Sequence, residues 1–537
     1  MAQQQQTSSI AAPGFFGLNL QESAVALSSG FALEAYNCVI DRYGRIGARR
    51  GWVPVNATNS DLGSNNIEFM FEVVDAGSTT LISAGNNKLF TGTTTLVEKK
   101  VREADNSDDL TYTITGNHWQ AAALPFGDGV DASPHAYLVQ AGHPALIYHE
   151  LPESGGDPHD HDSGAYGFVR LGDAGSLPPG YSTGEFMPNC VLAAYGRVWM
   201  ADIVGDRQTL YFSRLLDGSD FSGGDSGSLS LNAVFPNNDQ IIGLAAHNGF
   251  LIIFGRNNIA IYGNPIDVTE LTLADYIPNV GCVARDSIQN TGSDIVFLSD
   301  AGVRSLQRVI QEKSLPMRDI SKNVRDDLMT NVASESTIQI KSAYFQRDAF
   351  YLLALPTTKF VYCFDMRGAL QDGSARTTIW NNIDPRSFCV TADKELLIGK
   401  AGYVGKYFGH FDNTDTYRLQ YYTNYFDFEA PTSEKILKQI GMVLIGGSNQ
   451  DIAIKWGFDY TENYRAVTKR LDTAVAYEYN IGEYTVAEYS DGIVLDKFKT
   501  HVGGAGAIMQ VGLEAEINGN PLSIQRIDIY VKQGKTV

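Results

Sequence analysis

The chain has 537 residues, of which 44% are hydrophobic and 11% aromatic, so it can build full-sized cores and general disorder is excluded. Its 61 acidic residues against 41 basic ones give a formal net charge of −20, which excludes the dense lysine and arginine surface of a protein that grips nucleic acid. The length predicts two or three domains, or one large repeat domain. The acidic surface has two explanations: solubility, or a surface that must not bind DNA.

The cysteines and the N-terminus indicate the cellular context. Five cysteines are widely spaced, with no C-x-x-C pair: Cys38, Cys190, Cys282, Cys363 and Cys389. They predict buried thiols in a protein assembled in a reducing cytoplasm, without a zinc site or a disulfide framework. The polar N-terminus does not match a signal peptide, and no apolar run approaches the ~20 residues of a membrane span, so we expect no membrane-spanning segment.

Residues 1–59 are predicted to be an N-terminal arm and assembly segment. A polar tail leads to a possible short helix at 21–27 and a strand at 35–40. A basic cluster follows in this acidic chain, formed by Arg42, Arg45, Arg49 and Arg50. Two interpretations are open for these arginines: local ion pairs, or an assembly contact with another subunit or partner.

Residues 60–412 are predicted to form a β-propeller. A turn residue recurs at gaps of 45 to 57 residues, each time after a short strand that ends in small residues: Gly85, Gly142, Gly196, Gly249, Gly302, Asp348 and Asp393. This spacing is near the blade period of kelch-like propellers, and each blade would comprise about four short strands. The number of blades stays open.

The stretch from 239 to 328 shows the pattern best. Runs at 241–246, 250–254, 259–262 and 294–299 are β-branched and aromatic, and Asn-Gly or Asp-x-Gly turns divide them, which is typical of antiparallel hairpins. A helix is expected at 315–329, capped by Asp319 or Ser321, with Ile320, Val324 and Leu328 on one face. It would interrupt the propeller and pack against its rim.

Residues 413–537 are predicted to be a separate β-sandwich-like domain. Strands are expected at 417–428, 436–445 and 452–458, and a hairpin at the end, where 509–517 and 527–531 alternate in polarity around an Asn-Gly-Asn turn. The fold class is therefore all-β: a propeller with a short inserted helix, followed by a C-terminal sandwich-like domain.

No constellation of residues points to catalysis, a cofactor or a metal. His159 and His161 alternate with aspartates on a Gly-rich loop, which suits an exposed polar loop better than a metal site. Adjacent carboxylates such as Asp326 and Asp327 diverge on a helix, whereas a glycosidase needs a converging pair. The Asp-Ser-Gly at 225–227 lies in a Gly/Ser loop without a positioned histidine, and no Walker or dinucleotide motif occurs. We therefore expect that the chain is not an enzyme.

Several segments resemble the tail nozzle proteins (tail tubular protein B) of short-tailed bacteriophages. These short segments are spread between about residue 36 and residue 430 and so span most of the chain: 36–38, 44–46 and 49–52; 239–244, 251–255 and 281–288; 296–303 and 318–321; 402–407 and 412–413. Trp52 stands where the family often has a smaller residue. The loop 153–165 and much of the C-terminal domain have no counterpart in the resemblance.

The resemblance implies a virion structural protein. Its expected form is a homohexameric nozzle below the portal that docks the head-to-tail adaptor and tail fibres or spikes, and that conducts phage DNA without binding it specifically. The expected place is the phage tail, after assembly in the host cytoplasm. Two alternatives stay open: a propeller-fold tail enzyme acting on host surface polysaccharide, and a monomeric propeller used as a binding module.

Overall fold

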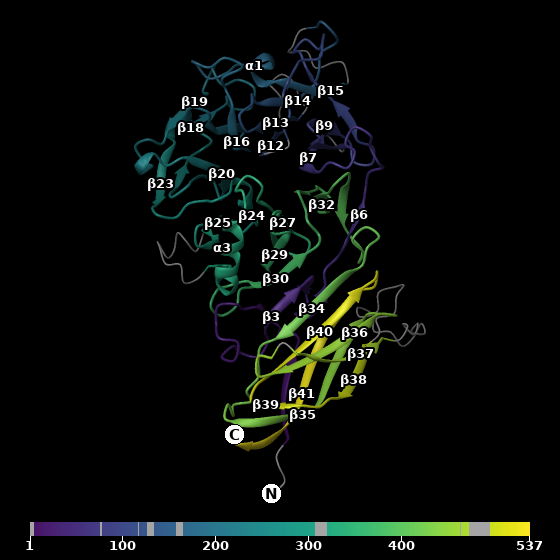
Figure 1. Ribbon diagram of the computed structural model, residues 1–537. Coiled ribbons are helices and arrows are strands. Elements are labelled where there is room, and N and C mark those ends of the chain that lie inside the picture. The colour runs from purple at the N-terminus through teal and green to yellow at the C-terminus, as the bar shows by residue number, and fades with distance from the viewer. Residues whose placement is uncertain are drawn as a thin grey trace, which may run out of the picture.

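The computed structural model describes residues 5–75, 78–115, 118–125, 134–156, 165–306, 319–461, 463–471 and 495–536. Figure 1 shows two bodies, a ring of small sheets above and a two-sheet sandwich below that contains both chain ends. The predicted all-β class is confirmed, with a propeller, a short inserted helix and a C-terminal sandwich. The N-terminal segment contributes strands to both bodies.

Four blades form the first part of the ring, and each is an antiparallel meander. The first comprises β7 (Ile67–Asp75), β8 (Ser78–Gly85), β9 (Lys88–Thr91) and β10 (Val97–Lys99). The second comprises β12 (Trp119–Leu124), β13 (His135–Gln140), β14 (Leu146–Glu150) and β15 (Tyr166–Arg170), with β11 (Val101–Arg102) parallel to β15. The third comprises β16 (Pro188–Ala194), β17 (Arg197–Ile203), β18 (Asp206–Phe212) and β19 (Gly227–Ser230). The fourth comprises β20 (Ile241–His247), β21 (Phe250–Gly255), β22 (Ile259–Gly263) and β23 (Thr272–Ile277).

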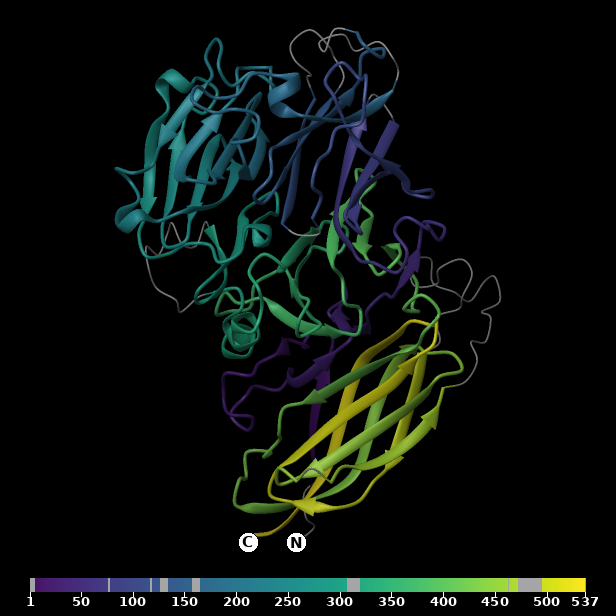
Figure 2. The ribbon, with the colours of Figure 1, turned by 45° about the horizontal axis from the view of Figure 1, so that its top comes forward.

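Three further sheets complete the ring (Figure 2). A three-stranded sheet comprises β24 (Gln289–Asn290), β25 (Ile295–Ser299) and β26 (Gly302–Ser305). The next blade comprises β27 (Lys341–Phe345), β28 (Phe350–Leu355), β29 (Phe360–Asp365) and β30 (Arg376–Asn381). The last comprises β31 (Ser387–Val390), β32 (Leu396–Gly399) and β33 (Val404–Tyr407), together with β6 (Trp52–Pro54) from the start of the chain. The described chain thus has six blades of four or five strands and one smaller sheet.

The repeat in the sequence corresponds to this ring. Each of the seven turn residues falls in a different sheet. Gly85, Gly142 and Gly302 lie at the turn after the second strand of the antiparallel meander in their sheet. Gly196, Gly249, Asp348 and Asp393 lie at the turn after the first strand. The spacing of the turn residues therefore varies, although each sheet is one unit of the ring.

Apolar side chains fill the spaces between neighbouring sheets. For example, Trp199 and Phe212 of the third blade pack with Leu251 and Ile253 of the fourth. A strand such as β17 is buried at every position, because neighbouring sheets cover both of its faces. This explains why the middle strands of the blades have continuous apolar runs instead of alternating ones.

A ten-stranded sheet joins the two bodies. Its order is β27-β28-β29-β30-β2-β3-β34-β40-β36-β37, so a propeller blade continues through β2 (Gly17–Leu18) and β3 (Phe31–Tyr36) into the sandwich. Gly17 has φ +80°, and a Cβ there would lie 2.6 Å from the carbonyl oxygen of Thr377. Glycine is therefore required where β2 meets β30. Continuous backbone pairing couples propeller and sandwich mechanically.

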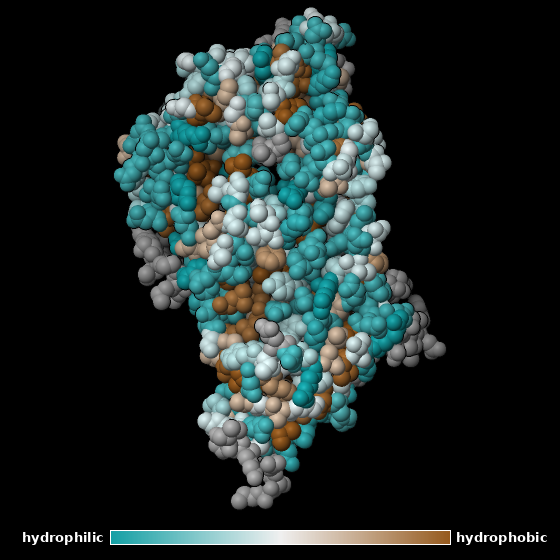
Figure 3. Space-filling model, in the orientation of Figure 1, coloured by the Kyte–Doolittle hydropathy of each residue, from teal (hydrophilic) through white to brown (hydrophobic). Residues whose placement is uncertain are grey.

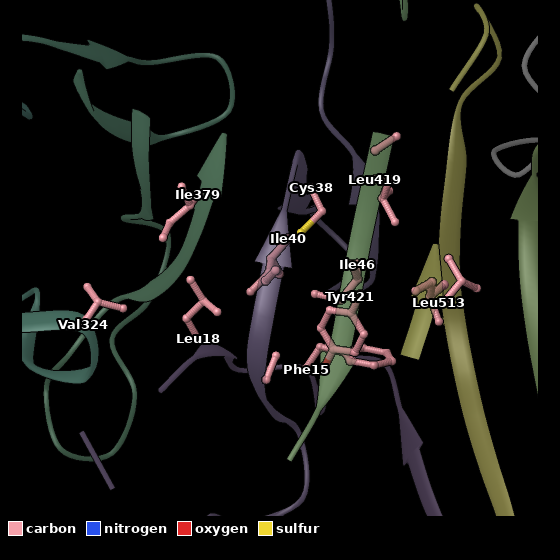
Figure 4. Packing of buried hydrophobic residues seen from close by; sticks show 14 of the residues in the cluster. Phe15, Leu18, Cys38, Ile40, Ile46, Val324, Ile379, Leu419, Tyr421 and Leu513 are labelled. Carbon is pink, nitrogen blue, oxygen red and sulfur yellow. The ribbon is translucent and has the colours of Figure 1, made fainter. Parts of the chain in front are cut away.

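The sandwich has two sheets. One is the far part of the ten-stranded sheet: β34 (Tyr417–Thr423), β40 (Met509–Ile517), β36 (Asp451–Phe458) and β37 (Arg465–Arg470). The other comprises β4 (Cys38–Ile40), β5 (Ile46–Ala48), β41 (Leu522–Thr536), β35 (Ser433–Gly446) and β38 (Leu495–His501), with β1 (Gln5–Ala11) on β41 and β39 (Ala505–Gly506) on β35. Figure 4 shows N-terminal side chains such as Phe15 and Ile46 packed beside Tyr421 and Leu513. The sandwich therefore needs both ends of the chain.

The predicted C-terminal hairpin is wrong. β40 spans the expected residues, and β41 extends five residues beyond the expected strand at each end, but β40 pairs with β34 and β36, whereas β41 pairs with β35, β1 and β5. The Asn518–Asn520 turn thus leads from one sheet to the other. Both strands alternate in polarity because each presents one apolar face to the space between the sheets, and this alternation does not distinguish a hairpin from a crossing.

The inserted helix begins later than predicted. A 3-10 turn at Lys322–Val324 leads into α3 (Arg325–Ala333), and the expected first residues, 315–318, lie outside the described residues. Ile320, Val324 and Leu328 are buried as expected. The predicted caps do not form: Ser321 Oγ accepts a hydrogen bond from the Val303 backbone, and Asp319 pairs with Arg304. The segment 21–27, expected as a possible helix, has only turns.

The cysteines and the helices bear on the remaining expectations. All five cysteines are free thiols and buried. Within the described residues, no helix is both long and apolar enough to cross a membrane. In the space-filling view of Figure 3, hydrophilic residues cover most of the visible face and hydrophobic ones lie between them.

Candidate functional site

The predicted arginine cluster divides into two parts. Arg45 pairs with Asp41 at 2.6 Å within the β4–β5 turn, and the guanidinium groups of Arg42 and Arg45 lie 4.7 Å and 4.5 Å from the ring centre of Tyr43. Arg42 and Tyr43 are exposed. This part of the cluster is therefore an accessible basic and aromatic turn, whereas Arg49 lies inside the protein.

Arg49 is wholly buried between the propeller and the sandwich. Its two Nη atoms donate to the two carboxylate oxygens of Asp412 at 2.8 Å and 2.7 Å, and its Nε donates to Asn37 at 3.0 Å. The guanidinium also lies 4.1 Å from the ring centre of Tyr417. Burial alone lowers the pKa of Arg49, but the hydrogen bonds and charge of Asp412 outweigh it and raise that pKa. Arg49 is therefore held in a buried ion pair with a residue far along the chain, and Arg50 beside it is partly buried.

The Arg49 network joins distant parts of the chain. Asn37, which has a φ of 54°, donates through its amide to Asn381 of β30 at 2.5 Å and to the carbonyl of Arg418 in β34 at 2.7 Å. Asp412 follows the last propeller strand, and Tyr417 opens the sandwich. The network therefore connects the propeller with the sandwich at their junction.

A second polar cluster lies at the axis of the propeller. A partly enclosed pocket of about 140 Å³ is lined by Pro356, which follows β28, and by residues in or just before the first strands of four blades: Asn66, Glu68, His118, Ile338, Gln339, Lys341 and Arg386. These first strands are neighbours around the ring. The lining residues are far apart in the sequence, and no local motif marks them, so sequence reasoning missed this pocket.

Ion pairs fix the cations of the pocket. Lys341 binds Asp286 at 2.5 Å, and Asp286 also accepts from Arg285 Nε at 2.7 Å. Arg285 further donates to the backbone carbonyls of Asn189 and Trp119, so it ties the second and third blades to this centre. On the other side, Arg386 binds Asp384 at 3.0 Å.

The titratable groups of the pocket have shifted pKa values. Burial alone raises the pKa of Asp286, but the charges of Arg285 and Lys341 outweigh it and hold that pKa below its ordinary value. Burial, together with the charge of Arg285, lowers the pKa of His118 to about 3, so its imidazole is neutral near pH 7. Burial raises the pKa of Glu68, although Asn66, Arg386 and Lys341 oppose the shift.

The other candidate motifs do not form a site among the described residues. His159 and His161 lie outside those residues, and within them no group of three or more His, Cys, Asp or Glu side chains is suited to a metal. Asp327 accepts from the Tyr362 hydroxyl at 2.6 Å, whereas Asp326 is exposed, so the pair diverges. Asp225 of the Asp-Ser-Gly sequence binds Arg197 and the backbone of Leu215.

Comparisons with known proteins find only distant structural likenesses. No family model matches the chain, and no curated protein matches it. Among solved structures, it is similar to the Pan2 WD40 domain of Neurospora crassa, with 10% identity over 67% of this chain and 96% of that one, at a TM-score of 0.35. It is also similar to the extracellular domain of BT4673, a putative one-component system of B. thetaiotaomicron, with 9% identity, 67% of this chain covered and a TM-score of 0.36, and it spans 40% of that chain.

A third solved structure covers nearly the whole chain. The exo-β-1,3-galactanase of Phanerochaete chrysosporium has 9% identity over 97% of this chain and 100% of that one, at a TM-score of 0.25. None of these three is described as a phage tail protein. At these identities and scores, the likenesses carry no argument about activity.

Proposed function

We propose that this chain is a structural subunit of a phage tail, a nozzle protein that assembles as a homohexamer and conducts DNA. The proposal rests on where the structure has the segments that resemble the tail nozzle proteins. These segments contain buried contacts that hold elements together: Arg49 with Asp412 at the junction of the two bodies, and Arg285 with Asp286 at the propeller axis.

Close contacts made by the segments of the resemblance also hold the fourth blade together. The Asp239 carboxylate accepts hydrogen bonds from the backbone of Arg256 and Asn257 and from the side chain of Asn258. Gly281 packs so closely on the Arg256 backbone that a Cβ would lie 2.2 Å from it. A resemblance concentrated in such contacts supports a shared architecture, and a rigid architecture suits a structural subunit.

The DNA path of this proposal lies between subunits. The axial pocket measures about 140 Å³, the volume of a sphere only about 6 Å across. The major groove of B-DNA alone is about 12 Å wide, so a duplex does not fit in this pocket. A duplex therefore needs a bore that several copies surround. Part of the net charge of −20 would face that bore and repel DNA phosphates, which keeps the passing genome from binding. The proposed partners are the adaptor and the tail fibres or spikes, and the proposed role is not catalytic.

Solution mass tests the assembly step. Sedimentation velocity or native mass spectrometry over a range of concentrations is expected to detect a species of about six times 58.6 kDa. A chain that stays monomeric with the adaptor protein present contradicts the hexamer. Turnover of host surface polysaccharide by the purified protein contradicts the non-catalytic role.

A further inference from the structure

The axial pocket keeps opposite charges apart. Lys341 and Arg386 line it, as does the carboxylate of Glu68. Among the described residues, neither cation lies within ion-pair distance of Glu68, although both influence its pKa. Lys341 and Arg386 are each paired with an aspartate instead, Asp286 and Asp384, so the cations and Glu68 line the pocket without closing it by a direct ion pair. Here a space of about 140 Å³ separates them.

The wall offers a defined set of hydrogen-bonding groups. Lys341 and Arg386 keep 13% and 26% of their side chains exposed, so each can offer further N–H groups beside its aspartate. Gln339 and Asn66 add amides, and the neutral imidazole of His118 adds one donor and one acceptor. Glu68 is the carboxylate of the lining and can accept from a donor on a ligand.

From this arrangement we propose that the axial pocket binds a small carboxylate that also carries a hydroxyl or ammonium donor. The ligand carboxylate lies against Arg386 and Lys341, and its donor lies against Glu68. A simple anion fits less well because Glu68 repels it, and a neutral sugar offers no charged acceptor to the N–H groups that Lys341 and Arg386 keep beside their aspartates.

Two kinds of molecule share this chemistry: a sugar acid, such as the uronate of an acidic polysaccharide, and a free α-amino acid. Both place a carboxylate next to a hydroxyl or an ammonium group. The inference goes beyond the proposed tail role and does not depend on it, since it concerns a single subunit.

Calorimetric titration of the full chain tests the proposal, with glucuronate, glutamate, glucose and acetate as separate probes. We expect glucuronate or glutamate to bind with a Kd near or below about 1 mM, and glucose and acetate to bind at least tenfold more weakly. Binding of glucuronate alone identifies a sugar-acid site, and binding of glutamate alone identifies an amino-acid site. Both outcomes support the proposal.

Three variants locate the binding. Arg386→Gln is expected to weaken binding at least tenfold, and Arg42→Gln, which changes an exposed arginine outside the pocket, is expected to bind as the wild type does. Since Arg386→Gln also leaves Asp384 without its cation, Glu68→Gln serves as a near-isosteric second variant and is expected to reduce the preference for glutamate or glucuronate over acetate. The proposal is overturned if no probe binds, if acetate binds as well as glucuronate and glutamate, or if neither pocket variant changes the binding.

Discussion

At the scale of single residues, Arg49 is a buried structural member of the predicted basic cluster, whereas Arg42 of the same cluster is exposed. The charge of Arg49 is buried, and a bidentate carboxylate, an amide and an aromatic ring surround it. A buried ion pair adds little net stability, but removal of one partner leaves the other charge buried and uncompensated. Arg49 and Asp412 therefore act as a unit that specifies the junction.

Arg49→Met tests this role. The variant is expected to lose about 3–5 kcal/mol of unfolding free energy, because Asp412 is then buried without its cation. Urea denaturation measures the loss, and Arg42→Gln, at an exposed position, is expected to change stability by less than about 0.5 kcal/mol. An Arg49→Met protein as stable as Arg42→Gln would show that the pair does not hold the junction.

Glu514 of β40 gives a pH-dependent prediction. It accepts from Lys455 at 2.7 Å and from the Tyr422 hydroxyl at 2.5 Å, and it also binds Arg418. Burial alone raises its pKa, but these partners outweigh burial and lower the pKa to about 2 from an ordinary value of 4.5. Because the folded-state pKa is the lower one, the ionised group stabilises the fold above about pH 4.5, and this contribution is lost as the pH falls through about 2.

The comparison of wild type with Glu514→Gln measures that contribution. The stability difference between the two proteins is expected to be constant above about pH 5 and to vanish near pH 2. Denaturation midpoints at a series of pH values provide the measurement. A difference that does not change with pH contradicts the assignment of the shifted pKa to Glu514.

At the scale of elements, the sandwich is built from two separate parts of the sequence. The first 48 residues supply β1 and β5, which pair with β41, and β4, which pairs with β5. In the chain, the propeller lies between these strands and β34. Ile10, Ile40 and Ile46 fill the same core as Leu513 and Ile529. The propeller is thus an insertion into the sandwich, and β6 closes its ring on the way in.

A truncation tests this arrangement. Residues 413–537 alone are expected to remain unfolded or to aggregate, because they lack β1, β4 and β5 and the apolar side chains that these strands bury. A chain in which residues 1–51 are joined to residues 408–537 by a short linker is expected to fold. Circular dichroism and amide NMR dispersion of the two fragments distinguish these outcomes. A well-folded 413–537 fragment would contradict the shared sandwich.

Local patterns in the sequence predicted the strands but not all of their partners. The hairpin at 241–254 forms as expected because its turn and its apolar runs are adjacent. β40 and β41 meet the same criteria, yet they lie in different sheets, because alternation describes which face is buried and not which strand lies beside it. The axial pocket gathers residues from four blades, and no local spacing encodes that convergence.

At the scale of the whole molecule, continuous backbone pairing and a buried ion pair join the propeller to the sandwich. A subunit joined in this way suits a ring in which each copy keeps one orientation. In the proposed ring, part of the net charge of −20 would face the bore, where acidic side chains repel the phosphates of a passing duplex.

Cryo-electron microscopy of the assembled protein tests the proposed conduit most directly. We expect a closed six-fold ring, with a bore between the subunits that is wide enough for duplex DNA and predominantly acidic along its wall. A closed ring with a neutral or basic bore would contradict the role assigned to the charge. A protein that forms no ring, alone or with its adaptor, would contradict the nozzle itself.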